Sequence, residues 1–271
     1  IEKLAGNINI QKTVNRIFDQ NVCKFLNVLS EEILKDQGAR KYVDLVTFAF
    51  WIRGKNLDKI KTRYINGEIR LGHGLAFHIT PANIALNFAY SFVFSLLAGN
   101  SNIVRVTNTK FEQNEIFFKI LEKILNIKKF KFIKNSNLFI RYNYDDNITK
   151  LISSNCDCRV IWGSDKTVEK IKEFSIQTTC KELIFPDRYS MSLINLNNFS
   201  KMKSKDYLDL AKKFYLDALL FDQNACSSPH LIIWCGKKNE KSYNKFWDNL
   251  NIAVKEGKYF IPNEKNKFDK Y

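Results

Sequence analysis

From residue 75 onward the sequence alternates short apolar runs with helical patterns, and this alternation constrains the fold more than any other feature. The clearest stretch begins at Gly74 and reads GLAFHITPANIALNFAYSFVFSLLAGNSNIVRVTN. It predicts a strand over residues 75–79, an apolar helix over 84–98 and a further strand over 103–106. Repeats of strand, helix and strand are typical of parallel sheets with helices on their faces, so we expect an α/β fold.

The same alternation continues along the chain. Further strands are expected at residues 138–142, 159–162, 193–196 and 231–235, and further helices at 114–125, 148–153, 166–174, 207–220 and 244–254. Before residue 70, apolar residues at helical spacing predict helices within residues 10–35 and again at 45–52.

The net charge of +15, from 43 basic and 28 acidic residues, raises the question of a nucleic-acid or membrane partner. The lysines are scattered through every segment, and none forms a stripe interleaved with aromatic residues. We therefore expect no nucleic-acid partner, although a basic surface would favour a phosphate-rich ligand.

Six cysteines in a chain without a signal peptide indicate thiols in a reducing compartment, so we expect a cytoplasmic protein. The longest apolar run, residues 84–98, is too short to span a bilayer. The chain begins at Ile1 without Met and stops in a polar stretch at Tyr271, which suggests a fragment.

Three loops stand at the carboxyl ends of predicted strands, the position at which open parallel sheets bind ligands. They comprise residues 80–83, 105–108 and 163–166. Position alone is weak support for a site, because any doubly wound protein has several such loops.

In their order and spacing, these loops and the cysteine loop around Cys226 resemble the aldehyde dehydrogenase superfamily. They are most similar to its fatty acyl-CoA reductase branch, the reductase subunit of bacterial luminescence systems. The stretches concerned, within residues 72–234, are HITPANIALN, LLAGNSNIVRVTN, RVIWGSDKTVEKI and DQNACSSPHLIIW.

This resemblance implies a doubly wound, mostly parallel sheet in a Rossmann-like cofactor domain, together with the beginning of a second α/β catalytic domain. On that basis residues 1–70 form a helical region packing on the cofactor domain, residues 71–221 the nucleotide-binding domain, and residues 222–271 an incomplete catalytic domain. The chain would then be truncated after the catalytic cysteine.

Cys226 is the candidate nucleophile. It follows a polar loop and precedes a predicted strand, so its sulfur can face a cleft, and a thiolate is a strong nucleophile. The alternative is a buried inert thiol, and we expect the other five cysteines to be thiols of that kind. The resemblance implies that Asn83 is an oxyanion-hole residue acting with the Cys226 amide. A helix cap is the alternative role for Asn83.

The resemblance assigns the cofactor to the strand-end loops. Arg105 takes the place of a lysine that contacts the ribose or its phosphate in relatives, and the guanidinium fork favours NADPH over NADH. A solvated arginine is the alternative. The turn at Gly163 and Ser164 would lead into a helix whose N-terminal amides approach the pyrophosphate of the cofactor. Thr80, Pro81 and Thr107 belong to the same expected cofactor site.

Two further residues are candidates for acid or base roles. In KELIFPDRYSMSLI, aligning Arg188 with the family's lysine puts Ile184 where aldehyde oxidisers carry a water-activating glutamate, although a register shift would bring in Glu182. Without activated water, an acyl enzyme would survive until reduced. His230 lies four residues after Cys226, but Pro229 between them argues against a helix that would pair them.

The resemblance thus implies NADPH-dependent reduction of a fatty acyl-CoA, or another acyl thioester, to the aldehyde through an acyl-cysteine. The alternatives are an aldehyde-oxidising NAD(P) dehydrogenase and a truncated, non-catalytic nucleotide-binding chain. Expected partners are acyl-CoA or an acylated carrier protein, with assembly as a homo-oligomer or with an acyl-transfer or activating subunit. No metal is expected, because Cys156 and Cys158 have the wrong spacing for a zinc knuckle.

Overall fold

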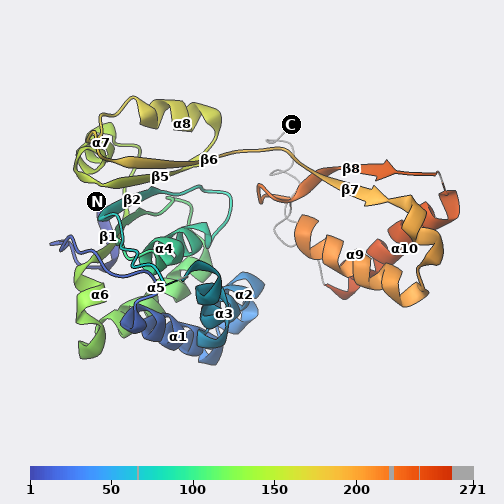
Figure 1. Cartoon of the computed structure of the whole chain (residues 1–271), viewed down its shortest axis with the longest axis horizontal. Coiled ribbons are helices and arrows are strands. Elements are labelled where there is room, and N and C mark those ends of the chain that lie inside the picture. Colours follow the sequence, from blue (N-terminus) through green and yellow to red (C-terminus); the bar gives the residue numbers. More distant parts are fainter. Residues whose placement is uncertain (66, 220–222, 238, 258–271) are drawn as a thin grey trace. The chain divides into compact units, whose positions relative to one another are not determined.

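The computed structural model describes residues 1–65, 67–219, 223–237 and 239–257. The chain divides into two compact units, Ile1–Pro186 and Asp187–Tyr271, each with its own core (Figure 1). The sequence placed the boundary between residues 221 and 222 instead. The structural boundary precedes the predicted one in the chain because Ile194 and Leu196 pack in one core with Phe246 and Leu250 of the last helix.

Unit 1 is built on a six-stranded sheet in the order β1-β4-β3-β2-β5-β6. β2 to β6 run parallel, while β1 is antiparallel to β4, so the predicted mostly parallel sheet is confirmed. The strands are β1 (Glu2–Gly6), β2 (Leu75–Ile79), β3 (Ser101–Arg105), β4 (Asn137–Arg141), β5 (Cys158–Gly163) and β6 (Lys181–Pro186).

Helices cover both faces of this sheet, as a doubly wound fold requires. α7 (Asp146–Asn155) and α8 (Asp165–Lys172) lie on one face, and α4 (Asn87–Leu97) and α5 (Glu112–Leu125) lie on the other (Figure 1). Because successive strand residues point to opposite faces, each strand serves two cores. In β3, for example, Ile103 joins the core on the α7 and α8 side, whereas Val104 joins the core of α4 and α5.

The remaining helices of unit 1 extend the α4 and α5 side: α1 (Gln20–Lys35), α2 (Val43–Ile52), α3 (Gly54–Tyr64) and α6 (Lys131–Asn135), with 3-10 turns η1 (Ala39–Lys41) and η2 (Lys128–Phe130). The first helix begins later than its apolar spacing predicts. Asp19 caps it by accepting hydrogen bonds from the amides of Asn21 and Val22, 2.8 and 3.2 Å away. The amides of Gln11 and Asn15 instead bond to the carbonyls of Asn135 and Gly99.

Unit 2 contains a two-stranded parallel sheet covered on one face by two helices (Figure 1). Its elements are β7 (Ser190–Asn195), η3 (Leu196–Lys201), α9 (Ser204–Ala218), β8 (Pro229–Cys235) and α10 (Glu240–Glu256). Ile194, Ile232 and Trp234 face α9 and α10. Leu193 and Ile233, on the alternate positions, remain exposed.

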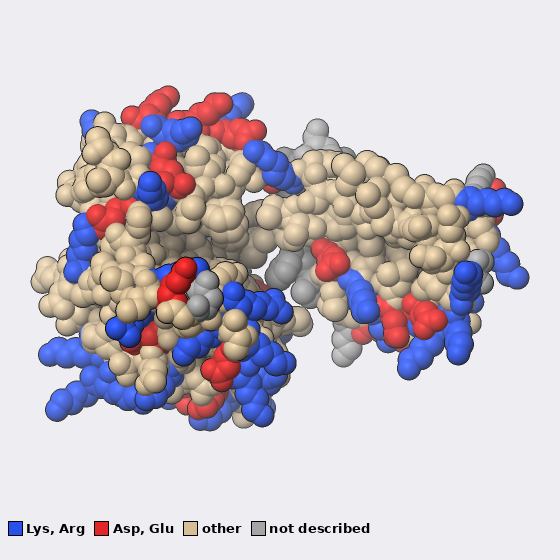
Figure 2. Space-filling view, in the orientation of Figure 1, with Lys and Arg blue, Asp and Glu red and all other residues tan. Residues whose placement is uncertain are grey.

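The charged side chains are mixed in sign on the face shown in Figure 2. Lys and Arg gather over the helices below the sheet of unit 1 and over α9 and α10, with Asp and Glu between them. Among the described residues, no helix is long and apolar enough to cross a membrane.

Candidate active site

The loops after β2, β3 and β5 lie beside one another at the carboxyl ends of these strands. β2 pairs in parallel with both β3 and β5, with Ile79 opposite Arg105 on one side and opposite Ile161 on the other. The loops after these strands are therefore neighbours, as the sequence predicts. Thr80 ties two of them together, because its Oγ1 donates a hydrogen bond to the Arg105 carbonyl at 2.7 Å.

Arg105 is packed between aromatic rings at this edge. Its guanidinium carbon lies 4.9 Å from the centre of the Tyr142 ring and 5.3 Å from that of Tyr144. Its Nε is buried and, among the described residues, has no hydrogen-bond partner. A buried donor without an acceptor is unfavourable, so an acceptor oxygen from a bound molecule would stabilise this site.

The two tyrosines beside Arg105 were not found from the sequence. They follow the fourth strand, so their position after a strand at the ligand-binding edge was the signal that could have found them. Tyr142 is buried and bonded to Thr149, and Tyr144 is almost fully exposed.

Thr107 has a structural part in the same loop. Its Oγ1 accepts a hydrogen bond from the Thr109 amide at 3.2 Å, and its carbonyl accepts one from Arg141 Nε at 3.2 Å. The Thr107 side chain is buried, so it holds the loop after β3 in shape rather than presenting a free hydroxyl. Pro81 is half-buried at the start of the neighbouring loop.

The turn at Gly163 and Ser164 connects β5 to α8. Ser164 is the N-cap, and its Oγ accepts from the Thr167 amide at 3.4 Å. A Cβ at position 163 would lie 3.0 Å from Thr167, so the turn is crowded. Asp165 in the first helical turn places a negative charge beside the amides that an anion would approach. That charge opposes a bound pyrophosphate.

Asn83 does not cap the following helix, which corrects one of its two expected roles. α4 begins at Asn87 with Leu86 as its N-cap, so Asn83 lies in the preceding loop, where it is exposed. The oxyanion role remains a prediction, because Asn83 belongs to unit 1 and Cys226 to unit 2.

Glu182 forms an ion pair with a buried arginine. Its Oε1 accepts from Arg159 Nε at 2.9 Å and from Arg159 Nη2 at 2.6 Å. The pair lies near the amino ends of β5 and β6, away from the loops described above. This arrangement gives Glu182 a structural role and argues against the acid or base role. Ile184, further along β6, is 36% exposed.

His78 lies inside a buried hydrogen-bond network. Its Nδ1 is 2.8 Å from Ser91 Oγ and its Nε2 is 3.0 Å from Asn102 Oδ1. The carboxamide oxygen can only accept, so Nε2 carries the proton and Ser91 donates to Nδ1. Burial lowers the pKa of His78 to about 4, which keeps the imidazole neutral near pH 7.

Cys226 is exposed on the turn between α9 and β8, so it is not a buried inert thiol. Ser190 Oγ donates to the Cys226 carbonyl at 2.6 Å, and the Ser228 amide donates to the Ala225 carbonyl at 2.9 Å. Ser228 is buried, and its Oγ donates to the Asp217 carbonyl at 2.9 Å. The turn is therefore anchored from β7 and from α9.

The remaining cysteines differ in exposure. Cys156 and Cys158 are buried, and burial raises both their pKa values, that of Cys158 to about 11. Cys23 and Cys180 are half-buried. Cys235 is exposed, which corrects the expectation that it is a buried thiol, so exposure alone does not single out Cys226.

His230 packs against an aromatic ring. The centres of the His230 and Tyr189 rings are 5.0 Å apart, with 32° between their planes. In the part of the chain that the structure describes, no hydrogen bond joins His230 to Cys226. No group of three or more metal-binding side chains is present among these residues either.

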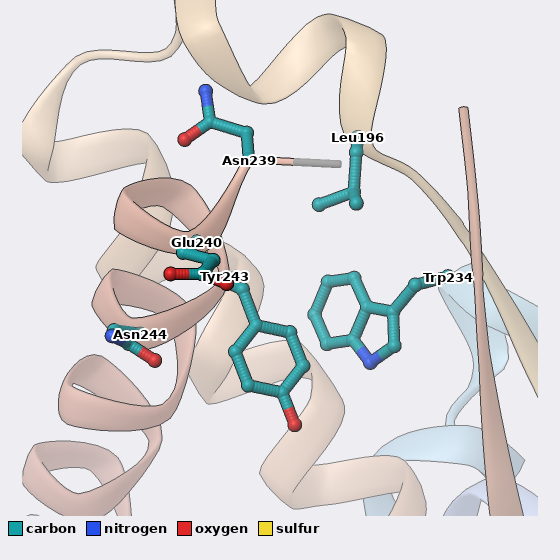
Figure 3. A pocket seen from close by; sticks show the side chains of 6 residues that line it. All are labelled: Leu196, Trp234, Asn239, Glu240, Tyr243 and Asn244. Carbon is teal, nitrogen blue, oxygen red and sulfur yellow. The ribbon is translucent and has the colours of Figure 1, made fainter. Parts of the chain in front are cut away.

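A cavity of about 430 Å³ opens in unit 2 beside two aromatic rings (Figure 3). It is lined by Leu196, Trp234, Asn239, Glu240, Tyr243 and Asn244. Trp234 is near the carboxyl end of β8, whereas Cys226 precedes its amino end. The length of β8 therefore separates this cavity from the cysteine turn.

The architecture matches solved aldehyde dehydrogenases. An aldehyde dehydrogenase from Bartonella henselae is 14% identical with a TM-score of 0.59, over 84% of this chain and 51% of that one. Betaine aldehyde dehydrogenase from Staphylococcus aureus, solved with NAD+, is 15% identical with a TM-score of 0.59, over 87% and 48%. A 1-pyrroline-5-carboxylate dehydrogenase from Thermus with bound NAD is 12% identical with a TM-score of 0.60, over 87% and 49%. The fold is that of the aldehyde dehydrogenases, and the chain spans about half their length.

Sequence comparison narrows this class to a family. The family model for acyl-CoA reductase (LuxC) matches residues 52–270, most of the chain. The chain therefore belongs to the acyl-CoA reductase (LuxC) family. No curated protein matches it.

Proposed function

We propose that the protein containing this chain reduces an acyl thioester to an aldehyde with NADPH, and that Cys226 carries the acyl group. The observation that carries this proposal is the exposed thiol of Cys226, held on a turn by hydrogen bonds from Ser190 and Ser228 in a chain of this family. A thiol that is accessible and fixed in place suits nucleophilic attack.

In the first half-reaction, the Cys226 thiolate attacks the thioester carbonyl. The side-chain amide of Asn83 and the backbone N–H of Cys226 stabilise the tetrahedral oxyanion. When that intermediate collapses, the thiolate of coenzyme A leaves and the acyl group stays on the sulfur.

In the second half-reaction, the acyl-cysteine carbonyl would accept a hydride that NADPH, held by Arg105 and the other strand-end loops, would supply. The oxyanion donors hold the negative charge that develops on the carbonyl oxygen, and a proton yields a hemithioacetal. Its collapse releases the aldehyde and regenerates the thiol of Cys226. Ile184 in place of a water-activating carboxylate would let the acyl-cysteine persist until reduction.

Two features of the sheet edge support a phosphate-bearing dinucleotide. The buried Nε of Arg105 requires an acceptor, and the loop sequence RVTNT after β3 carries no carboxylate to repel a phosphate. Asn108 extends the polar edge, and its amide donates to Asn143 Oδ1 at 3.2 Å. Asp165 counts against a pyrophosphate at α8, so Arg105 carries more of the cofactor proposal than Gly163 and Ser164 do.

An aldehyde-oxidising dehydrogenase is the second candidate, because the solved structures with this fold include a betaine aldehyde dehydrogenase and a 1-pyrroline-5-carboxylate dehydrogenase, both with NAD. That reaction needs water as the acyl acceptor. An assay of acyl-CoA with NADPH against aldehyde with NAD separates the two. Nucleotide binding without turnover would instead support a non-catalytic chain.

Acyl-CoA or an acylated carrier protein is the proposed donor, and a homo-oligomer or a complex with an acyl-transfer subunit is the proposed assembly. The family's thioester chemistry supports the donor. Size-exclusion chromatography with light scattering, with and without acylated carrier protein, measures both the assembly and the donor complex.

The decisive experiment is intact mass spectrometry after acyl-CoA is added without cofactor. We expect one acyl adduct on the native chain and none on Cys226→Ala. Cys235→Ala is the matched control, because Cys235 is the other exposed thiol among the described residues, and it should keep the adduct. An adduct that persists in Cys226→Ala contradicts the proposal.

A further inference from the structure

We infer that Ser190 is a positioning residue for the Cys226 nucleophile, an inference that rests on the proposed function. Ser190 is the first residue of β7, and its Oγ lies 2.6 Å from the Cys226 carbonyl oxygen. This bond crosses between two segments 36 residues apart, so it fixes the cysteine turn against the sheet of unit 2.

The pairing of β7 with β8 explains why a side chain, rather than the backbone, holds the cysteine turn. Ser190 stands opposite Pro229, which has no backbone N–H to donate to the ladder. The register then shifts, so that Met191 stands opposite Leu231 and His230 is left as an extra residue. Such a bulge interrupts the backbone hydrogen bonds between β7 and β8 at the point where β8 begins after the cysteine turn. The hydrogen bond from the Ser190 hydroxyl holds the turn where those backbone bonds are missing.

A held carbonyl restricts rotation of the backbone that carries the cysteine sulfur and amide. Acyl transfer requires the sulfur and the oxyanion donors in one orientation, whereas alkylation by a small reagent requires only an accessible thiol. Loss of the Ser190 bond should therefore slow acyl transfer selectively.

The test compares acylation of Cys226 by acyl-CoA with its alkylation by iodoacetamide, both followed by mass spectrometry. For Ser190→Ala we expect acylation about tenfold slower, with alkylation unchanged. Ser190→Thr keeps the hydroxyl and should restore the acylation rate. Ser227→Ala, a change to an exposed serine of the same turn, is the matched control and should behave as the native chain.

Acylation of Ser190→Ala at the native rate would overturn the inference, as would equal slowing of alkylation, which indicates a disturbed fold. If the native chain accepts no acyl group, the proposed function itself fails and the positioning role fails with it. The two failures are thus distinguished by the native chain alone.

A second observation, independent of the enzymatic proposal, concerns two thiols in unit 1. The Sγ atoms of Cys156 and Cys180 lie 3.9 Å apart. Cys156 is buried just before β5, and Cys180 is half-buried just before β6, so the two stand at the amino ends of neighbouring strands. We propose that Cys156 and Cys180 form a thiol–disulfide site that reacts with low-molecular-weight disulfides.

The reaction runs in two exchanges. The accessible Cys180 thiolate attacks a sulfur of glutathione disulfide, forming a mixed disulfide and releasing one glutathione thiol. Cys156 then attacks the Cys180 sulfur, forming the Cys156–Cys180 disulfide and releasing the second glutathione. Two protein thiols are oxidised and one disulfide is reduced. Burial raises the pKa of both thiols, so exchange should be faster at higher pH.

The new bond would close a loop containing β5, the turn at Gly163 and Ser164, and α8. Such a bond restricts the unfolded chain and should raise the melting temperature of unit 1. It would also join the base of β6, the edge strand of the sheet, to its neighbour.

The test is non-reducing peptide mapping after incubation with glutathione disulfide. We expect a peptide linking Cys156 and Cys180 in the native chain, and a glutathione adduct that remains on Cys180 in Cys156→Ser. Cys158→Ser is the matched control and should still form the link. A native chain in which Cys180 keeps glutathione, or does not react, overturns the proposal.

Discussion

The hydroxyl of Thr80 donates a hydrogen bond to the carbonyl of Arg105, and this 2.7 Å contact joins the ends of β2 and β3. It fixes the backbone from which the Arg105 guanidinium extends between Tyr142 and Tyr144. The arginine at the centre of the proposed cofactor site is thus positioned through its main chain and through its aromatic neighbours.

Replacing Arg105 with glutamine should weaken NADPH binding more than NADH binding. The guanidinium would lose a charge-assisted hydrogen bond to phosphate, so the dissociation constant for NADPH should rise about tenfold. Fluorescence titration of both dinucleotides measures this difference. Arg63→Gln, a change on the exposed surface of α3, is the control, and equal losses for both dinucleotides would contradict a phosphate contact.

Replacing Asn83 with alanine should slow acylation of Cys226 by roughly a hundredfold, because one oxyanion donor is commonly worth about 3 kcal/mol. Rapid-quench mass spectrometry with acyl-CoA measures the rate. Urea denaturation of the variant and of the native chain separates a loss of acylation from a loss of folding. Native acylation kinetics in Asn83→Ala would show that the two residues do not act together.

Replacing Glu182 with glutamine should lower the free energy of unfolding by about 3 kcal/mol, because it leaves the buried Arg159 without its charge partner. Urea denaturation measures the change. The matched control is Glu68→Gln in the exposed pair with Arg70, where a change below about 1 kcal/mol is expected. Equal losses in the free energy of unfolding for the two variants would contradict the prediction that the buried ion pair contributes more to stability than the exposed one.

The stability of unit 1 should fall as the pH is lowered from about 6.5 to about 4, because protonation favours the unfolded chain when the folded pKa of His78 is the lower one. This residue alone accounts for up to about 3 kcal/mol, present above pH 6.5 and lost by pH 4. Chemical denaturation at several pH values should show a shallower pH dependence in His78→Gln. His73→Gln, a change at an exposed histidine, should leave the native dependence intact.

Local patterns predicted most of the interior of the sheet. The strand Leu75–Ile79 was predicted with its observed bounds, and the turn at Gly163 was placed correctly, because both depend on neighbouring residues. β6 was missed because its apolar run, residues 183–185, is shorter than the run of about four to eight apolar residues that indicates a buried strand.

The cysteine turn was predicted less completely than the sheet. Its position before a strand followed from the sequence, and so did the candidate nucleophile Cys226. The anchor Ser190 did not, because it lies 36 residues away and meets the turn only when β7 and β8 pair. The ion pair of Glu182 with Arg159 did not follow from the sequence either, because the two residues meet only when β5 and β6 pair.

The sequence by itself determined the α/β class, the family and the loops at the carboxyl ends of the strands, because hydrophobic periodicity and motif order are carried by residues close together in the chain. Only the tertiary structure decided which side chains were used in packing and which stayed exposed. Ion pairs and hydrogen bonds such as Glu182 with Arg159 and Ser190 with Cys226 join segments distant in sequence, and their formation depends on how the strands pair.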